Sequence, residues 1–367
     1  MRKIKINVLS QGRFHMLDLS RELVKQGFDV KFYSYVPTRR CEKFGLEKKN
    51  NESLFLYMLP FLALKHYFHI DIIKQVEDLL ISLFMRKCDV VISLTGFILA
   101  PRAAQRRGSL VIFERGSKHI IEQKNILENN PFISSKEVIP IRNIQLNLEA
   151  YKIADYITIA SEHVKESFLK HEYPKEKLFV NPYGVDLSMF KPLSRTEKKY
   201  DFIMVGGWSY RKGCDLIIKA IRKTNYTLLH VGAIADIDMP KDKQFTHIAP
   251  VDQSELVNFY NKAKIFIFPS REDGFGMVLS QALACNLPII GSKDCGAPDL
   301  RKIVEFPQYI TIIKDYTAES LLSAMEESMR NYQSLHDKIY AGDAIKNLTW
   351  EAYGKRYADF LHKIVRE

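Results

Sequence analysis

Cysteine is scarce in this chain and shows no paired spacing. Its five cysteines, Cys41, Cys88, Cys214, Cys285 and Cys295, form no CxxC pair and no metal-binding pattern. Unpaired cysteines are typical of a reducing compartment, where thiols stay free. The cysteine pattern therefore argues against a disulfide-stabilised secreted protein and favours a cytoplasmic one.

Long apolar segments are also missing. The longest run, residues 54–64, contains Pro60 and is followed by Lys65, and its 11 residues cannot cross a bilayer. The amino-terminal apolar stretch is too short for a signal peptide. Residues 54–85 are nevertheless rich in large apolar side chains, and we expect a core strand and helix there. A membrane-facing or lipid-binding surface is the alternative.

Negative charge is sparse in the first half of the chain. Residues 1–200 hold 33 Lys and Arg against 22 Asp and Glu, whereas residues 201–367 hold 21 of each. The net charge of +11 therefore lies in the first half. A basic half favours an anionic partner, such as a membrane surface or a phosphorylated acceptor, and scattered solubilising lysines are the alternative. No basic run is interleaved with aromatic residues, so we expect no nucleic-acid partner.

A dinucleotide-binding fingerprint is also absent, because the loop after the first predicted strand has a single glycine, Gly12, instead of GxGxxG. What the chain does contain is a long alternation of apolar strand patterns and amphipathic helix patterns. A length of 367 residues is typical of about two domains. The predicted strands cover residues 3–9, 29–35, 90–94, 110–113, 156–160 and 179–181, then 201–205, 227–231, 265–268, 288–290 and 309–313.

These patterns predict an α/β protein with two Rossmann-like, doubly wound domains that face each other across a cleft. We expect an N-terminal, acceptor-binding domain over residues 1–192, a polar linker over 193–200 and a second domain over 201–348. An amphipathic pattern near the end of the chain predicts a helix within residues 349–367 that returns to the N-terminal domain.

The second domain holds the most informative stretch, residues 265–290, whose pattern predicts a strand, a turn, a helix and a strand. The turn places Gly274 and Gly276 before the helix, where free backbone N–H groups can bind an anion. Asp273 precedes these glycines, and Gln281 follows in the second turn of the helix. The turn follows a predicted strand and so lies at the carboxyl edge of the predicted sheet, where ligands of open α/β sheets bind. We therefore predict a site for a phosphorylated, hydroxyl-bearing molecule. The alternative is a helix cap at Asp273 and a surface Gln281.

A second glycine-containing turn, residues 206–213, follows the predicted strand at 201–205. It carries Arg211 and Lys212 directly before a predicted helix. Free N–H groups and two cations together suit a diphosphate. An ordinary glycine turn with solvated basic residues is the alternative.

Residues 269–290 resemble the PSxxEGFGxxxxEAxACGxPVI block of the retaining glycosyltransferases of family four. Further matches lie at residues 181–192, 205–213, 291–300 and 350–357. The resemblance covers most of residues 180–360 and is looser in the first half, where it depends on Gly12 and the strand order. It implies the B-type glycosyltransferase fold (GT-B), a nucleoside diphosphate sugar as donor substrate and retention of the anomeric configuration.

The resemblance also implies roles for single residues of the second domain. The first glutamate of the family block contacts the donor sugar and the second holds the nucleotide ribose; here these positions carry Asp273 and Gln281. Lys212 matches the family's phosphate-binding lysine, and Arg211 stands in for an arginine whose position holds Gly207. The remaining donor site implied in this way comprises Glu272, Gly274, Phe275, Gly276, Met277 and Val278.

In the first half, the resemblance implies that the loop at Gly12 closes over the diphosphate, while Arg13 and His15 meet the acceptor. His119 follows another strand, where the family places a histidine that could hydrogen-bond a sugar hydroxyl or the leaving phosphate. A surface residue at a helix start is the alternative for His15, and a structural role is the alternative for His119. The catalytic residues implied by the resemblance are His119, Lys212 and Asp273.

The implied activity is transfer of a hexose-type sugar to a hydroxyl of a glycan or polyprenyl-linked acceptor in cell-surface polysaccharide synthesis, such as lipopolysaccharide or capsule. The enzyme would act in the cytoplasm, peripherally at the inner face of an anionic membrane. Asp236 and Asp238 form a D-x-D pattern that binds metal in other glycosyltransferases, but we expect no metal and no cofactor. Two alternatives stay open: a nucleotide-sugar epimerase, which shares the two-domain fold, and a nucleotide-binding pseudoenzyme, which the altered Asp273 and Gln281 suggest.

Overall fold

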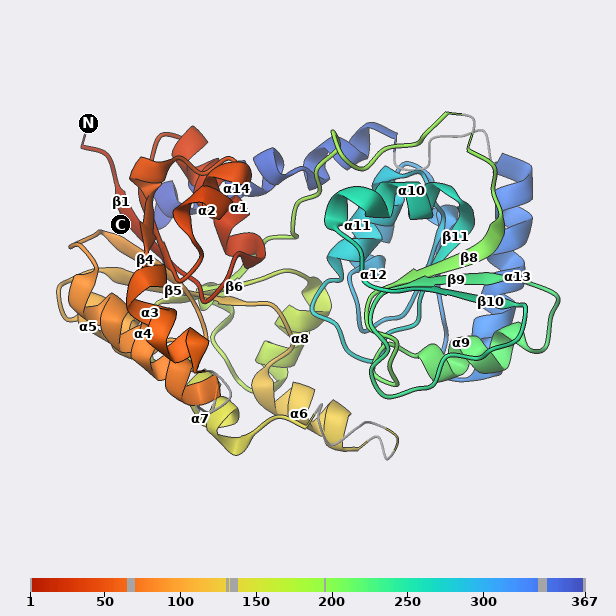
Figure 1. Cartoon of the computed structure of the whole chain (residues 1–367), viewed down its shortest axis with the longest axis horizontal. Helices are drawn as coiled ribbons and strands as arrows, with labels where there is room; N and C mark the ends of the chain where they lie inside the picture. The colour runs from red at the N-terminus through yellow and green to blue at the C-terminus, as the bar shows by residue number, and fades with distance from the viewer. Residues whose placement is uncertain are drawn as a thin grey trace.

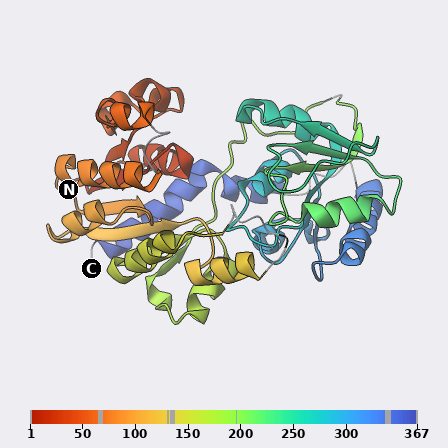
Figure 2. The same cartoon turned by 60° about the horizontal axis from the view of Figure 1, so that its bottom comes forward.

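The computed structural model describes residues 2–64, 70–129, 132, 138–194, 196–335 and 342–365. It shows two α/β domains side by side, each built on a parallel sheet that is covered by helices (Figures 1 and 2). The two sheets have seven and six strands. The expected fold class is therefore confirmed.

The N-terminal sheet has the strand order β3-β2-β1-β4-β5-β6-β7. The direction of winding reverses between β1 and β4, and the carboxyl ends of strands at such a switch point are where ligands of open α/β sheets bind. Val8 and Ile92 have no exposed surface, as expected for parallel strands that are covered on both faces. The strands are β1 (Lys5–Leu9), β2 (Asp29–Ser34), β3 (Asn51–Ser53), β4 (Val90–Leu94), β5 (Leu110–Arg115), β6 (Tyr156–Ile159) and β7 (Leu178–Val180).

The C-terminal sheet has the order β10-β9-β8-β11-β12-β13, so its own switch point lies between β8 and β11. These two strands pair in parallel, and Phe202 and Phe266 near their centres are fully buried. The strands are β8 (Tyr200–Val205), β9 (Leu228–Val231), β10 (Phe245–Ile248), β11 (Ala263–Phe268), β12 (Ile289–Gly291) and β13 (Ile310–Ile312).

Helices connect the strands in both domains. Those of the first domain are α1 (Phe14–Lys25), α2 (Thr38–Lys43), α3 (Phe55–Ala63), α4 (Ile70–Phe84), α5 (Leu99–Gln105), α6 (Ile120–Glu128), α7 (Ile141–Ile153) and α8 (Glu162–Lys170). Those that follow are α9 (Cys214–Ile221), α10 (Leu256–Asn261), α11 (Met277–Ala284), α12 (Ala297–Ile303), α13 (Ala318–Leu335) and α14 (Trp350–Ile364).

The last helix, α14, lies beside α1 of the first domain, which brings the two ends of the chain to the same side of the molecule (Figure 1). Thr349 caps α14 by accepting a hydrogen bond from the Ala352 N–H at 3.1 Å. Tyr353 and Tyr357 are fully buried, and the Tyr357 hydroxyl lies 3.1 Å from Thr158 Oγ1 of β6. These contacts hold the carboxyl end of the chain against the first domain.

The expectation of a core strand and helix over residues 54–85 is partly wrong. The first part forms the helix α3 instead of a strand, and its side chains Leu56 and Tyr57 are 76% and 56% exposed. On α4, Leu83 and Phe84 are 66% and 53% exposed, although Ile81 is fully buried. A continuous apolar run does not reveal which of its side chains face the core, because it lacks a helical or strand period.

The edge strands β3 and β10 were not predicted. Each has only three or four residues, and their sequences Asn-Glu-Ser and Phe-Thr-His-Ile mix polar with apolar side chains. Short, partly polar strands are typical of sheet edges, where one side of the strand meets solvent. Within the described residues, none of the helices combines the length and the apolar character that crossing a membrane requires.

We predict that Gly354→Val destabilises the protein. A Cβ atom at Gly354 would lie 2.3 Å from Cβ of Glu22, so the larger side chain forces α14 away from α1. Overpacking of this kind typically costs about 1–3 kcal/mol. Urea unfolding should show this loss, whereas Lys355→Ala, at an exposed position of the same helix, should leave the free energy of unfolding unchanged. Equal stability of the two variants would contradict the packing.

Candidate functional site

Three loops meet at the switch point of the C-terminal sheet: residues 206–213 after β8, residues 269–276 after β11 and residues 292–296 after β12. The Arg271 N–H donates to the Arg211 carbonyl at 2.8 Å, which joins the first loop to the second. The Asp273 N–H donates to the Asp294 carbonyl at 3.0 Å, which joins the second loop to the third. The backbone thus builds one rigid polar surface where ligands of such sheets bind.

The two cations expected to bind phosphate are both paired with carboxylates of the 269–276 loop. Lys212 Nζ forms an ion pair with Asp273, and Arg211 Nη1 lies 3.4 Å from Oε2 of Glu272. Arg211 also donates to the Glu272 carbonyl oxygen at 3.1 Å. The fold therefore brings together residues that lie 61 positions apart along the chain.

The Lys212–Asp273 pair sets the charge of the site. Burial pushes the pKa of Asp273 upward, but the charge and hydrogen bond of Lys212, together with the charge of Arg211, outweigh it and lower the pKa. Asp273 is therefore ionised at neutral pH. It also accepts the Phe275 N–H at 3.1 Å, so its carboxylate stabilises the turn that leads into α11.

Glu272 and Gln281 are both buried, with 1% and 7% of their surface exposed. Gln281 Oε1 accepts a hydrogen bond from the Tyr260 hydroxyl at 3.0 Å, from the neighbouring helix α10. The alternative of a surface Gln281 is therefore wrong. Met277 and Val278 form the first turn of α11, which begins after Gly276, a glycine in the left-handed region with φ of 80°.

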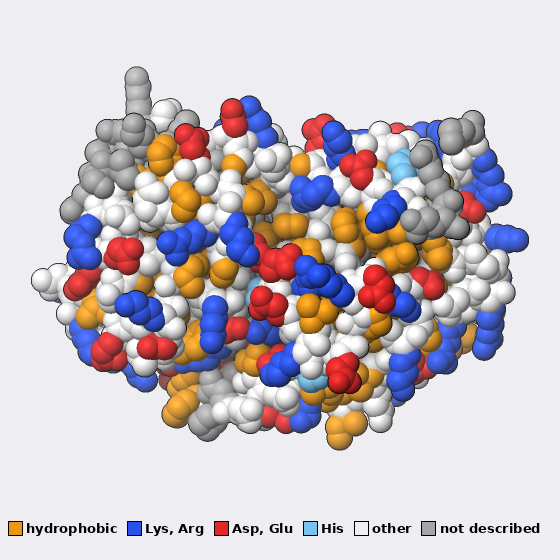
Figure 3. Space-filling view, turned by 180° about the vertical axis from the view of Figure 1, so that it is seen from behind, with side chains coloured by type: hydrophobic (Ala, Val, Ile, Leu, Met, Phe, Trp, Pro, Cys, Tyr) orange, Lys and Arg blue, Asp and Glu red, His pale blue; other side chains and the backbone are white. Residues whose placement is uncertain are grey.

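The first domain closes over the 269–276 loop through its own side chains. Ser161 Oγ donates to the Gly274 carbonyl at 2.5 Å, and His163 Nε2 lies 2.9 Å from the Asp273 carbonyl. Because a carbonyl oxygen only accepts, Nε2 of His163 carries the proton. Ser117 Oγ donates to Glu272 in the same region. Figure 3 shows acidic and basic side chains next to one another between the two halves of the molecule.

Backbone proximity makes this closure tight. A Cβ atom placed on Gly274 would lie 1.9 Å from the Gly116 carbonyl oxygen, so only glycine fits here in this arrangement of the domains. Lys118 adds an ion pair to Asp294 across the same junction. Ser117, Lys118, Ser161, His163 and Asp294 were not predicted, because their alignment with the donor loops depends on how the domains meet.

Gly12 and Arg13 lie in the loop between β1 and α1 of the first domain, and His15 lies in the first turn of α1. Arg13 Nη2 donates to Gln253 Oε1 of the second domain at 3.4 Å, and it lines an interdomain hollow of about 480 Å³. His15 Nε2 lies 3.2 Å from Glu114 Oε2, and its ring lies 4.5 Å from that of Tyr183. His15 thus forms a polar pair between the start of α1 and the end of β5, and because only 10% of its side chain is exposed, the surface alternative is wrong although the residue does lie at a helix start.

His119 lies away from these loops. Its ring packs on His171, Phe168 and Tyr151 at centroid distances of 4.3, 5.1 and 5.0 Å, and its Nδ1 caps α6 by accepting the Ile121 N–H. Burial and the neighbouring His171 lower the pKa of His119 to about 4, so the ring is neutral at pH 7. These contacts favour the structural alternative for this residue.

Asp236 and Asp238, the residues of the D-x-D pattern, lie in the segment that follows β9. Asp236 Oδ1 accepts the Tyr210 N–H at 2.9 Å and so stabilises the loop after β8, while Asp238 is exposed. Among the residues that the structure describes, no three His, Cys, Asp or Glu side chains lie close enough together to hold a metal ion.

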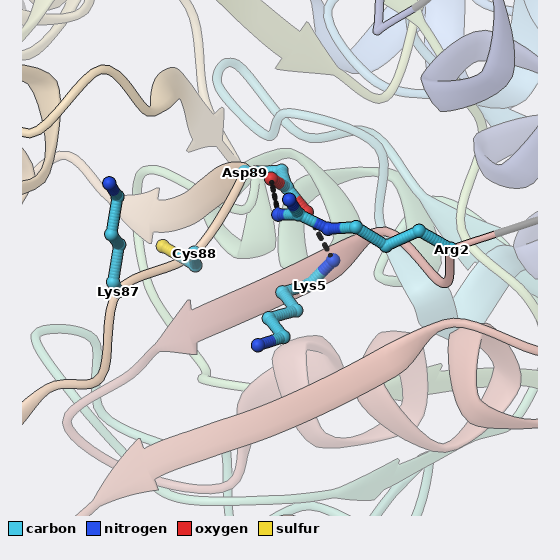
Figure 4. A pocket seen from close by; sticks show the side chains of 5 residues that line it. All are labelled: Arg2, Lys5, Lys87, Cys88 and Asp89. Atoms are coloured by element: carbon cyan, nitrogen blue, oxygen red, sulfur yellow. Dashed lines mark hydrogen bonds and ion pairs between the residues drawn. The ribbon is translucent and has the colours of Figure 1, made fainter.

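Another hollow lies at the opposite edge of the N-terminal sheet, where β1 and β4 begin (Figure 4). It measures about 420 Å³, and Asp89 in its wall is already bound by Arg2 at 2.7 Å and by the Lys5 N–H at 2.8 Å. Ligands of parallel sheets bind at the carboxyl edge, so this hollow is unrelated to the loops above.

Two parallel-sheet domains with polar loops facing each other define the class of this protein: it has the GT-B glycosyltransferase fold. Residues 187–344 match the family model described as Glycosyl transferases group 1. The matched segment contains the loops of Lys212 and Asp273. Membership of family four stays a prediction.

Known proteins resemble this chain over different lengths. The chain is 27% identical to a probable sucrose-phosphate synthase of Thermosipho melanesiensis, over 58% of this chain and 56% of that protein. It is 24% identical to the GDP-mannose-dependent alpha-(1-6)-phosphatidylinositol monomannoside mannosyltransferase of Mycolicibacterium smegmatis, over 57% of this chain and 62% of that one. The chain thus spans about half the length of the curated relatives it matches.

A solved structure covers nearly the whole chain. HepE of Anabaena, in complex with UDP and glucose, superposes with a TM-score of 0.69 and covers 98% of this chain and 100% of its own. The sequence identity is 13%, so this likeness shows the fold alone.

We predict that Gly274→Ala separates the two domains. The added methyl group would meet the Gly116 carbonyl at 1.9 Å, so the junction has to open. Small-angle X-ray scattering should show a larger radius of gyration than in the parent protein, and the melting temperature should fall. Gly207→Ala is the control, because an added Cβ there meets nothing within 4 Å. An unchanged radius of gyration for Gly274→Ala would contradict the closed arrangement.

We predict that protonation of His119 lowers the stability of the protein at acidic pH. Its folded-state pKa of about 4 lies below its ordinary value of 6.5, so the unfolded chain binds the proton first. The stabilisation that the neutral His119 ring gives the folded protein is fully present above pH 6.5 and is lost as the pH falls toward 4. At pH 5 the free energy of unfolding should therefore be lower by about 2 kcal/mol. Urea unfolding at pH 7 and pH 5 should show a smaller drop for His119→Asn, which keeps a capping oxygen without a proton to gain. Equal drops in both proteins would exclude this role.

Proposed function

We propose that this protein is a retaining glycosyltransferase that moves a sugar from a nucleoside diphosphate sugar to a hydroxyl group without a metal ion. The observation that carries the proposal is the position of Lys212 and Arg211. Both lie at the switch point of the C-terminal sheet, beside the start of α11 and facing the first domain. Glycosyl transfer from such a donor leaves a diphosphate, whose developing charge two cations and helix-start N–H groups can stabilise.

Donor binding would exchange one set of ion pairs for another. In the structure, Lys212 pairs with Asp273 and Arg211 with Glu272. A diphosphate is a stronger partner for both cations than a single carboxylate, since it offers more charge and more acceptor oxygens. Asp273 would then turn to the sugar hydroxyls, while Glu272 stays bound to Ser117. Gln281 would donate its amide to the ribose, with its oxygen held by Tyr260.

The same residues support a metal-independent course, and the resemblance of residues 269–290 to the block of the retaining family supports the retaining one. Lys212 and Arg211 supply the positive charge that a metal ion would otherwise bring to the leaving diphosphate. The carbonyls of Asp273 and Gly274 are held by His163 and Ser161, so the loop around the sugar is ordered before the donor arrives. His119 is assigned no catalytic step, since its side chain caps α6 within an aromatic cluster.

We further propose that the acceptor is a glycan or a polyprenyl-linked glycan of a cell-surface polysaccharide, bound by the first domain at the cytoplasmic face of a membrane. The basic excess of residues 1–200 and the exposed apolar side chains of α3 and α4, such as Leu56 and Leu83, support an anionic lipid surface. The mycobacterial relative, whose name includes a phosphatidylinositol acceptor, is consistent with a lipid-linked substrate.

The test is a panel of nucleoside diphosphates and their sugars, screened by thermal shift and then by release of diphosphate with and without acceptors. One or more nucleoside diphosphates should raise the melting temperature by a few degrees. If none does, the donor site is wrong. Turnover of the donor alone to an isomerised sugar would indicate an epimerase, and binding without any turnover would indicate a pseudoenzyme.

We predict that Lys212→Ala weakens nucleoside diphosphate binding at least tenfold and lowers kcat/KM by roughly 10²-fold or more. It removes a charge-assisted contact to the leaving group, which is typically worth about 1.5–3 kcal/mol or more. Isothermal titration and initial rates measure the two effects. Lys219→Ala, an exposed lysine on α9, is the matched control and should behave like the parent protein. Full activity of Lys212→Ala would remove the phosphate role from this residue.

A further inference from the structure

Two histidines face each other on neighbouring strands at the edge of the C-terminal sheet, and the proposed reaction uses neither. His230 of β9 lies directly opposite His247 of the edge strand β10. Their rings stack at a centroid distance of 5.0 Å. His230 has no exposed surface, whereas His247 is exposed. A buried imidazole is costly unless its nitrogens are bonded, so the partners of His230 show what it holds.

Hydrogen bonds fix the tautomer of each ring. His230 Nε2 lies 2.9 Å from the carbonyl oxygen of Gly206, and because a carbonyl only accepts, Nε2 carries the proton. A neutral imidazole has one N–H, so Nδ1 of His230 is an acceptor. It lies 2.9 Å from Nδ1 of His247, which therefore donates. The two histidines thus form a chain of hydrogen bonds that runs from the exposed sheet edge to Gly206.

His230 is neutral at physiological pH. Burial lowers its pKa, the hydrogen bond to the Gly206 carbonyl opposes this, and a positive charge on His247 lowers the pKa further, to about 4. Among the described residues, His247 is the titratable group whose charge acts on His230. The side chains of Met204, opposite on β8, and of Trp208 carry no charge. The one tautomer that donates to Gly206 is therefore kept at neutral pH.

The chain of hydrogen bonds ends at the first residue of the 206–213 loop. A Cβ atom at Gly232 would lie 2.0 Å from the Gly206 carbonyl oxygen, so this carbonyl is packed tightly against the segment that follows β9. The next contact is with Trp208, whose buried ring lies 4.9 Å from that of His230. His230 therefore contacts both the backbone and a side chain at the start of the loop.

The start of the loop in turn sets the position of Lys212. Trp208 donates its N–H to the Ala233 carbonyl at 2.8 Å, and Ser209 follows directly. The Lys212 N–H lies 3.2 Å from the Ser209 carbonyl oxygen and 3.3 Å from Ser209 Oγ. A shift of Trp208 would therefore move Ser209 and Lys212 with it. Displacements of about 1 Å at groups that position a substrate can lower a rate by roughly 10²-fold.

We propose that His230 and His247 are positioning residues that hold the loop of Lys212 in the geometry that binds the diphosphate. An aliphatic residue at position 230 would fill the same space, but it would leave the Gly206 carbonyl without the N–H donor that His230 supplies. Apolar contacts have no direction, whereas a fully bonded polar pair specifies one arrangement. The inference assigns both histidines to the phosphate side of the donor site and so rests on the proposed function.

Two substitutions of His230 separate positioning from packing. His230→Leu removes the donor to Gly206 and should weaken binding of UDP, GDP or ADP by about fivefold or more, the factor that corresponds to a typical hydrogen bond. His230→Gln, whose side-chain amide can donate to the same carbonyl, should bind within about twofold of the parent protein. Titration calorimetry measures the dissociation constants, and melting temperatures are recorded beside them. If His230→Leu lowers only the melting temperature and binds like the parent protein, the role is structural and the proposal is overturned.

NMR tests the hydrogen bonds in the parent protein itself, even where His230→Leu does not fold. Long-range ¹H–¹⁵N spectra at neutral pH should show His230 as a neutral ring that is protonated at Nε2 and unprotonated at Nδ1. A His230 ring protonated at Nδ1 would overturn the proposal. His247→Leu should shift the Nδ1 resonance of His230, whereas the control Lys243→Leu, at another exposed position just before β10, should leave it unchanged.

Hydrogen exchange separates this inference from the proposed function. If no nucleoside diphosphate binds the parent protein, the donor site is wrong, and amide exchange of residues 206–213 then decides whether the histidines hold the loop. These amides should exchange roughly threefold faster or more in His230→Leu, with a smaller increase in His247→Leu and none in Lys243→Leu. Equal exchange in all three variants would show that the histidines do not position the loop.

Discussion

The arrangement of the two domains depends on the contacts that the first domain makes with the backbone of residues 273–274 in the second. The carbonyls of Asp273 and Gly274 accept hydrogen bonds from His163 and Ser161, and Gly274 passes so close to Gly116 that a side chain would not fit. Backbone carbonyls that lose water on closure need such partners, because an unpaired buried carbonyl costs about as much as a lost hydrogen bond. The first domain therefore shapes the donor loop directly.

Ion pairs balance the charges where the two domains meet. Lys212, Arg211 and Lys118 each face a carboxylate, namely Asp273, Glu272 and Asp294. Partly buried cations left unpaired would be costly, and the pairs remove that cost. In the proposed function, a diphosphate would displace these carboxylates, so donor binding would be an exchange of partners rather than a simple addition.

The sequence predicted much of the fold because both halves repeat strong strand and helix patterns. The loops at 206–213 and 269–276 were placed correctly at the carboxyl ends of β8 and β11, whereas the donor site itself stays a prediction. His119 was expected beside the donor, but its neighbour Lys118 makes the contact to the second domain. Sequence spacing does not tell which of two adjacent loop residues, Lys118 or His119, points at the second domain, because loop side chains have no fixed period.

What the sequence alone determined is the class of the fold and the polar loops that follow β8 and β11, because glycines, cations and carboxylates at fixed spacing after a strand specify a local structure. What only the tertiary structure decided is everything that depends on two distant segments meeting. Residues 54–85 turned out to expose Leu56 and Leu83, and Gln11, Gly96 and Arg115 came together as one cavity. Sheet order placed them there: β1 pairs with β4, and β4 pairs with β5, although more than 80 residues separate the first pair along the chain. Strand order is set by packing across the whole domain, and local residue patterns do not encode it.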